Sequence, residues 1–342
     1  MILTRRISWK VVAALGLRTG MVAGPWAVLV FSLYAYAGLW FLRVPFLPIA
    51  TVGTAVAFYV GFKNNAAYER FWEGRKIWGG IVNASRTWAT AVVSYIDVGD
   101  ASDDARATRR ELVYRHLAWI NALRLQLRKT SRFHDKPARS TKRRLERHAE
   151  HMRNDWNAEL SPFLSAEELT ATSTVANAAT HLLAHQGTRI AGLVKAQRLD
   201  LFHQIAMMET VTELYALQGQ AERIKHTPFP RQYAEFSRVF TKLFGLLVPF
   251  GLLDVFADHV DASLTTLQTL TPVIPMLLSS WLITWVFTTM EGVGDASEDP
   301  FERSMNDVPM NALCRTIEID LRQLLGETDV PPRETAIDDI LY

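Results

Sequence analysis

Long stretches without a charged residue constrain this chain more than any other feature. The stretch Met21–Leu42 holds no Asp, Glu, Lys or Arg. As a helix it would reach roughly 33 Å, enough to cross the apolar core of a bilayer. Similar stretches follow at residues 44–62 and 262–290, and a shorter one lies at residues 243–253. The sequence therefore predicts an all-α, multi-pass membrane protein with four membrane helices in each subunit.

The remaining composition excludes several classes of function. The formal net charge of +2 argues against a basic nucleic-acid-binding surface, and the single cysteine, Cys314, excludes a disulfide framework within the chain. No Gly-rich phosphate loop, serine elbow or Cys/His pair is present, so we expect neither an enzyme nor a cofactor. His181 and His185 are spaced for one helix face, but nearby acidic residues are missing, so no metal site is expected.

Charge density divides the chain into alternating segments. The sequence predicts a cytosolic N-terminal segment (1–20), a membrane hairpin (21–62), a cytosolic helical region (63–236), a second membrane helix pair (237–290) and a cytosolic C-terminal part (291–342). Pro272 and Pro275 predict a break in the last membrane helix. The basic segment Arg128–Arg153 is typical of a solvated helical face, with a phosphate or lipid contact as the alternative.

The distribution of lysine and arginine predicts the orientation in the membrane. Basic residues flank the hairpin on one side: Arg5, Arg6, Lys10 and Arg18 before it, and Lys63, Arg70, Arg75 and Lys76 after it. The opposite side carries only Arg43, and residues 254–261 contain three aspartates and no lysine or arginine. The positive-inside rule then places both termini and the central helical region in the cytoplasm of a cell-membrane protein.

The second membrane stretch has two distinct stripes when it is read as a helix. One stripe, four residues apart, consists of Thr54, Phe58 and Phe62, and a parallel stripe of small residues consists of Gly53, Ala57 and Gly61. Small residues let membrane helices approach closely. The phenylalanines could simply face lipid or core, or the helices of several copies could surround an axis and form a hydrophobic constriction.

The continuation of this helix, from Lys63 to Gly80, resembles the signature that follows the second membrane helix of bestrophin channels, particularly the bacterial ones. The positions that carry the resemblance are Asn64, Asn65, Tyr68, Arg70, Trp72, Arg75, Trp78 and Gly79. Three further stretches agree in order, at residues 219–233, 298–301 and 313–318. The resemblance covers nearly the whole chain.

The resemblance implies a homopentamer in the lipid bilayer, with a central pore for monovalent ions. It places the narrow neck at Thr54, Phe58 and Phe62, where relatives usually have a larger apolar residue at the first position. Five threonines would make that ring wider and more polar. A second, cytosolic constriction is implied at Phe202, with Leu199 and Ile205 as alternatives.

Animal bestrophins are opened by calcium held in an acidic clasp after the fourth membrane helix. Glu298 and Asp299 of that clasp remain here, but Arg303 stands where relatives add acidic residues. Calcium takes six to eight oxygen ligands, so we expect no calcium gating. Asp299 and Pro300 are instead expected to begin the following cytosolic helix.

Three functions remain open on the sequence. We favour a passive anion channel, conducting ions such as chloride, because phenyl ring edges carry partial positive charge and Phe58 would face the ions. A cation (sodium)-conducting relative is the alternative, because Asp254, Asp258 and Asp261 could concentrate cations at the outer mouth. A non-conducting membrane scaffold is the third, and its stripe would be mere packing.

Overall fold

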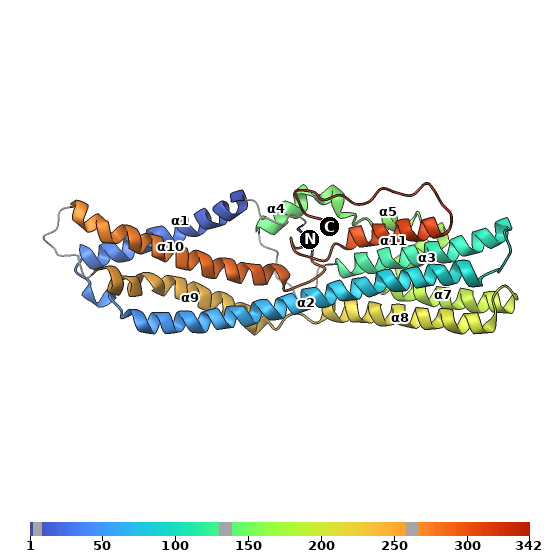
Figure 1. The fold of residues 1–342 in the computed structure, drawn as a ribbon, viewed down its shortest axis with the longest axis horizontal. Coiled ribbons are helices and arrows are strands. Elements are labelled where there is room, and N and C mark those ends of the chain that lie inside the picture. The colour runs from blue at the N-terminus through green and yellow to red at the C-terminus, as the bar shows by residue number, and fades with distance from the viewer. Residues whose placement is uncertain (3–8, 130–138, 258–265) are drawn as a thin grey trace. The chain divides into compact units, whose positions relative to one another are not determined.

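The computed structural model describes residues 1–2, 9–129, 139–257 and 266–342, and apart from isolated bridges these ranges form only helices, turns and loops. In chain order the elements are α1 (Trp9–Ala35), η1 (Trp40–Leu42), α2 (Phe46–Tyr95), α3 (Asp103–Leu127), α4 (Arg139–Arg147), η2 (Ala149–Met152), α5 (Trp156–Leu160), α6 (Ala166–Thr174), α7 (Ala178–Lys195), α8 (Leu201–His226), α9 (Arg231–Phe256), α10 (Thr266–Ser297) and α11 (Met310–Leu324) (Figure 1). The all-α class is therefore confirmed.

The chain forms two compact units, and α2 contributes residues to both. The first, here called the membrane unit, comprises Thr4–Glu69 and Phe229–Glu298. The second, here called the polar unit, comprises Met1–Leu3, Arg70–Pro228 and Asp299–Tyr342. The sequence placed its boundaries at residues 62, 236 and 290, whereas the two units divide after residues 69, 228 and 298.

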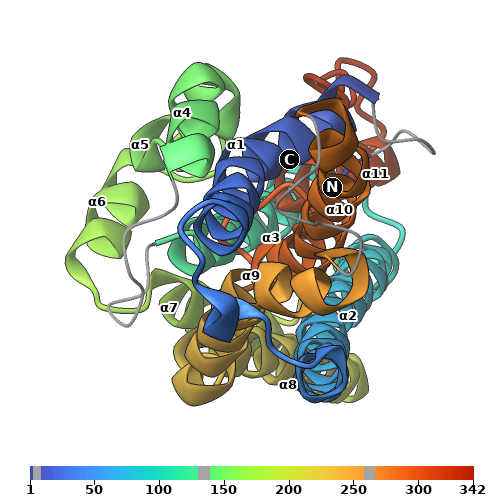
Figure 2. The same ribbon diagram turned by 90° about the vertical axis from the view of Figure 1, so that its left-hand side faces the viewer.

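The membrane unit packs α1, the first part of α2, α9 and α10 side by side (Figures 1 and 2). Each of these helices is long and apolar enough to cross a membrane, with mean hydropathies between 1.4 and 1.8. Between 11% and 39% of each apolar window is buried, so most of these side chains face outward, as membrane helices require. The four membrane helices are confirmed.

Two details of the membrane helices differ from the sequence expectation. The first helix lies at Trp9–Ala35 and not at residues 21–42, because the chain turns at Gly38, whose φ is +67°. The exposed Arg18 lies inside this helix, so an uncharged stretch does not mark where a helix begins. The break predicted at Pro272 and Pro275 is absent from α10, which is continuous. Membrane helices tolerate proline because neighbouring groups satisfy the freed carbonyls.

The polar unit is built around α3, which contacts α7, α8, α11 and α5. The side chain of Ser102 caps the start of α3 by accepting the amide N–H of Ala105 at 3.2 Å. Three tryptophans are fully buried in the core of this unit: Trp78, Trp88 and Trp119. The amphipathic helix predicted near residues 312–325 is α11, which buries its apolar face against α3.

A buried histidine in the polar unit predicts a pH dependence of stability. His116 is packed between Trp88 and Trp119, and its Nε2 lies 2.8 Å from Ser85 Oγ. Complete burial lowers the pKa of His116 from 6.5 to about 3. Below about pH 6.5 the unfolded chain therefore binds a proton that the folded chain does not. The free energy of unfolding should fall by up to about 1.4 kcal/mol per pH unit across this window.

Thermal unfolding of the wild type and of His116→Gln, measured at intervals from about pH 7 to about pH 4, checks this expectation. The wild type should lose stability more steeply than the variant as the pH falls. Equal slopes for the two proteins would show that His116 does not contribute to the pH dependence.

Candidate functional site

The predicted stripe lies on the outer surface of α2. Phe58 and Phe62 are 66% and 72% exposed in the single chain, and Thr54 is exposed as well. The buried side of the same helix carries Val56 and Val60, which pack against α9 and α10. By helical periodicity the stripe points almost directly away from that buried side. The rings therefore face lipid, a neighbouring subunit or a pore.

The hydroxyl proton of Thr54 is not available for hydrogen bonding outside α2. The hydroxyl donates a hydrogen bond to the carbonyl oxygen of Ala50 at 3.0 Å, one turn back in the helix. The donor is used inside α2, so Thr54 offers its methyl group and an oxygen lone pair. A ring of threonines would be wider than a ring of larger side chains but would present few free donors.

The stripe of small residues does not act as one surface. A side chain at Gly53 would begin 2.6 Å from the ring of Phe244, so α9 requires a glycine there. A side chain at Gly61 would meet nothing within 4 Å in the single chain. Gly53 therefore serves packing inside the subunit, while Gly61 remains on the exposed surface.

A buried charge cluster fixes the rotation of α2 immediately after Phe62. The side chain of Lys63 is 0% exposed, and its Nζ lies 3.0 Å from Glu291 Oε1 and 3.8 Å from Glu298 Oε2. Asp295 accepts a further hydrogen bond from Lys63 and pairs with Arg238 at 3.2 Å. Because Lys63 must reach these carboxylates on α10, the rings one and five residues earlier are held facing outward.

The aspartate nearest the end of α9, Asp254, is already paired. Asp254 Oδ1 lies 3.0 Å from Arg43 Nε, and its Oδ2 accepts the amide N–H of Phe46 at 3.1 Å, where α2 begins. The carboxylate thus caps α2 and is offset by a guanidinium. Asp258 and Asp261 lie outside the described residues.

The second predicted constriction falls at the start of α8. Phe202 and Ile205 are 78% and 54% exposed. Asp200 caps this helix by accepting the amide N–H of Phe202 at 2.8 Å. Leu199 precedes the cap and is buried in the core of the polar unit, so it is wrong as an alternative lining residue.

Comparison with known proteins gives a consistent result. The family model described as bacterial/fungal bestrophin protein matches residues 3–323. The chain belongs to the bacterial and fungal bestrophin family. The crystal structure of a bacterial bestrophin homolog from Klebsiella pneumoniae has the same fold, with a TM-score of 0.74 at 24% identity, over 91% of this chain and 98% of that one.

Among its relatives is the voltage-dependent anion channel-forming protein YneE of Escherichia coli K12. It is 28% identical over 300 residues, 88% of this chain and 82% of that protein. A protein of the same description from Mesorhizobium japonicum is 30% identical over 286 residues, 84% of this chain and 76% of its own length. The bestrophin family is one of ion channels and not of enzymes.

The first residue of the bestrophin signature, Asn64, connects α2 to α10 inside the membrane unit. Asn64 Nδ2 donates to the carbonyl oxygen of Met290 at 2.9 Å. The side chain of Asn64 occupies the space that a Cβ at Gly294 would need, so the close approach depends on that glycine. Asn65 bonds Glu69 within α2 at 3.0 Å. Asn64 is therefore a contact between helices, whereas Asn65 acts locally.

The later signature residues support the polar unit. Arg70 Nη2 donates to the carbonyl oxygens of Thr227 at 2.9 Å and Ile224 at 3.3 Å, and so satisfies the end of α8. Trp78 is fully buried in the core. The remaining members are more superficial: Tyr68 and Trp72 are about half exposed, and Arg75 extends along the helix over Gly79.

The loop between α10 and α11 is organised by an aspartate that the sequence did not single out. The buried carboxylate of Asp307 accepts the amide N–H groups of Phe301 and Val308 at 2.7 Å and of Arg303 at 2.5 Å. These bonds hold Phe301 and Arg303 at positive φ, +74° and +64°. The expectation that Asp299 and Pro300 begin a helix is wrong, because α11 begins at Met310.

The remaining acidic residues of the clasp each lie beside a cation. Glu298 Oε2 is 3.8 Å from Lys63 Nζ, and Asp299 Oδ1 is 4.0 Å from Arg70 Nη2. Within the described ranges, no group of three or more His, Cys, Asp or Glu side chains is arranged to hold a metal ion.

We therefore expect the same ion flux with micromolar calcium as with a strong chelator. A several-fold rise on adding calcium, lost in Asp299→Ala, would contradict this expectation.

Proposed function

We propose that this protein is a passive anion channel in which five copies of α2 surround a central neck lined by Thr54, Phe58 and Phe62. The observation that carries the proposal is the exposed aromatic stripe on the side of α2 that faces away from its own subunit. In this assembly Phe202 and Ile205 line the cytosolic exit. Both chain termini and the polar unit lie in the cytoplasm, as the basic residues around the hairpin indicate.

The neck acts through hydrophobicity and size. Rings of phenylalanine from several subunits narrow a passage and make it easy to dewet, so ions cross only when the rings open or rotate. The positive edges of the phenyl rings favour an anion over a cation at that level.

The cation-conducting alternative depends on negative charge at the outer mouth. Of the three aspartates that could supply this charge, Asp254 is offset by Arg43. The relatives from Escherichia coli and Mesorhizobium japonicum are described as voltage-dependent anion channel-forming proteins, which agrees with an anion as the permeant ion.

Purified protein in liposomes tests the proposal. Vesicles are loaded with a chloride gradient or a sodium gradient, and the flux of each ion is recorded. We expect chloride flux well above that of protein-free vesicles and a smaller sodium flux. Larger sodium flux would favour the cation channel, and no flux of either ion would favour the scaffold.

A further inference from the structure

In the described part of the basic segment 128–153, Arg143 and Arg147 are exposed, as a solvated face predicts, but Arg128 and Arg144 are not. Arg128 is buried, and its Nη1 donates to the carbonyl oxygen of Met152 at 2.7 Å. Arg303 Nη2 donates to the carbonyl oxygen of Arg128 at 3.1 Å, and Arg144 Nη2 donates to that of Arg303 at 2.6 Å. Arg128, Arg144 and Arg303, here called the arginine cluster, are thus held together by backbone carbonyls.

Two acidic residues, Glu302 and Asp307, act on Arg303, and Glu302 also bonds Lys225. The Nε atoms of all three arginines are buried and have no hydrogen-bond partner among the described residues. The carboxylate of Asp307, a nearby acidic group, already accepts three amide N–H groups. Burial, together with Arg124 and Arg303, lowers the pKa of Arg128 to about 9. A buried cation without a full counter-charge is costly, so an anion bound nearby would stabilise this part of the unit.

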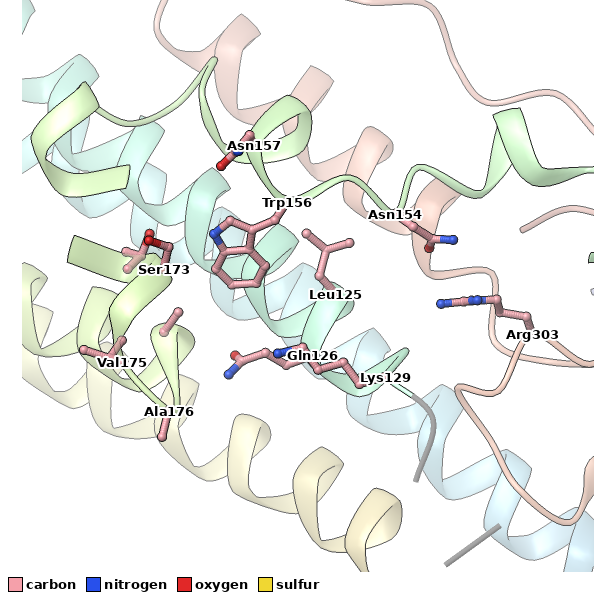
Figure 3. A pocket seen from close by; sticks show the side chains of 12 residues that line it. Leu125, Gln126, Lys129, Asn154, Trp156, Asn157, Ser173, Val175, Ala176 and Arg303 are labelled. Atoms are coloured by element: carbon pink, nitrogen blue, oxygen red, sulfur yellow. The ribbon is translucent and has the colours of Figure 1, made fainter. Parts of the chain in front are cut away.

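A cavity of about 480 Å³ opens beside Arg303 (Figure 3). Two of its lining residues, Lys129 and Arg303, are cationic, and none of the described residues that line it is acidic. The indole of Trp156 lines the cavity. Figure 3 shows Arg303 and Asn154 at one end and Ser173 at the other. The cavity therefore combines two cations with an aromatic surface.

The size and lining of the cavity indicate the class of ligand. A water molecule takes about 30 Å³ in the liquid, so a bare halide would leave most of the cavity empty. Cavities of about 300–1,000 Å³ typically hold small organic molecules. The side chains of Leu125 and Val175 add apolar surface beside Trp156. The best match is an anion with an apolar or aromatic body.

We propose that this cavity binds a small soluble organic anion, with its phosphate or carboxylate head at Lys129 and Arg303 and its body against Trp156. Guanidinium and ammonium groups are the usual partners of such heads. The site lies wholly within the polar unit and is separate from the exposed stripe on α2.

Calorimetric titration of the purified full-length protein tests the site with phenyl phosphate, which has both an anionic head and an aromatic body. Inorganic phosphate supplies the head alone and benzyl alcohol the body alone. We expect saturable binding of phenyl phosphate, at least about tenfold tighter than binding of inorganic phosphate, and no measurable binding of benzyl alcohol. Benzoate, with a carboxylate head, should also bind.

Variants separate the site from unspecific attraction. Lys129→Gln should weaken phenyl phosphate binding several-fold, because it removes the exposed cation that lies over the ring of Trp156, 5.9 Å from its centroid. Lys195→Gln removes the same charge from the end of α7 and should leave binding unchanged. Trp156→Phe should reduce the preference for phenyl phosphate over inorganic phosphate.

Arg303→Gln is the second charge variant, with thermal unfolding as a control because Arg303 also bonds Arg128. No saturable binding of phenyl phosphate to the wild type, or equal binding by the wild type and Lys129→Gln, would overturn the proposal. Glycerophosphoglycerol represents a lipid headgroup, and its binding in preference to phenyl phosphate would overturn the assignment to a soluble ligand.

Discussion

A channel with Phe58→Ala is expected to conduct several-fold more than the wild type. The ring of Phe58 is 66% exposed on α2, opposite the face that packs inside the subunit. Around a pore, truncating five rings at one level removes much of the apolar surface that dewets the neck. Single-channel recording in planar bilayers, or liposome flux at matched protein density, measures the change.

The matched control truncates an exposed phenylalanine that lies outside the stripe. Phe236, on α9, is 49% exposed, so Phe236→Ala removes a similar ring from the surface of the same unit. Its conductance should stay close to that of the wild type. If Phe58→Ala and Phe62→Ala both conduct like the wild type, the stripe does not line the passage.

Replacing Lys63 with methionine is expected to destabilise the membrane unit by about 3–5 kcal/mol, because removing one member of a buried ionic cluster leaves charges without compensation. Lys63 Nζ is completely buried and lies among Glu291, Asp295 and Glu298. In the variant Arg238 still pairs with Asp295 at 3.2 Å, but the cation at the centre of the carboxylates is gone. The temperature of unfolding, followed in detergent by the loss of the assembled protein, measures the effect.

A charge-matched rescue distinguishes electrostatics from packing. Lys63→Met combined with Glu291→Gln removes one cation and one anion, and should recover part of the lost stability. Lys63→Arg keeps the charge and should be milder than Lys63→Met. Equal losses for Lys63→Met alone and with Glu291→Gln would show that the cluster acts through side-chain volume only.

The features that the sequence predicted are local ones. The spacing of Thr54, Phe58 and Phe62 fixes their common face once a helix is assumed, because helical geometry depends on neighbouring residues alone. Apolar length likewise predicts membrane helices without knowledge of their partners. The residues at which helices begin and end were predicted less accurately. The helix α1 ends because the chain turns at Gly38, and the pattern of charged residues does not show this turn.

The features that the sequence missed depend on residues far apart in the chain. Lys63 bonds Glu291, which lies 228 positions away in the chain. The residues near Lys63 in the sequence do not predict that its ammonium group is buried. From the sequence, Arg128 is predicted to be a solvated basic residue. In the structure its carbonyl oxygen accepts a hydrogen bond from Arg303, which lies 175 positions later in the chain. Leu199 was a plausible lining residue by counting along the chain, but the cap at Asp200 leaves it in the core.

The central claim, that the stripe on α2 lines the ion passage, is tested most directly by single-cysteine accessibility. The native Cys314 is 1% exposed, and burial raises the pKa of its thiol to about 11, so the wild type supplies an unreactive background. A charged methanethiosulfonate reagent is added to liposomes that contain Thr54→Cys, Phe58→Cys or the buried control Val60→Cys. We predict that it blocks chloride flux through the first two variants and leaves the control and the wild type unaffected. Undiminished flux through Phe58→Cys after mass spectrometry has shown complete labelling would contradict the account.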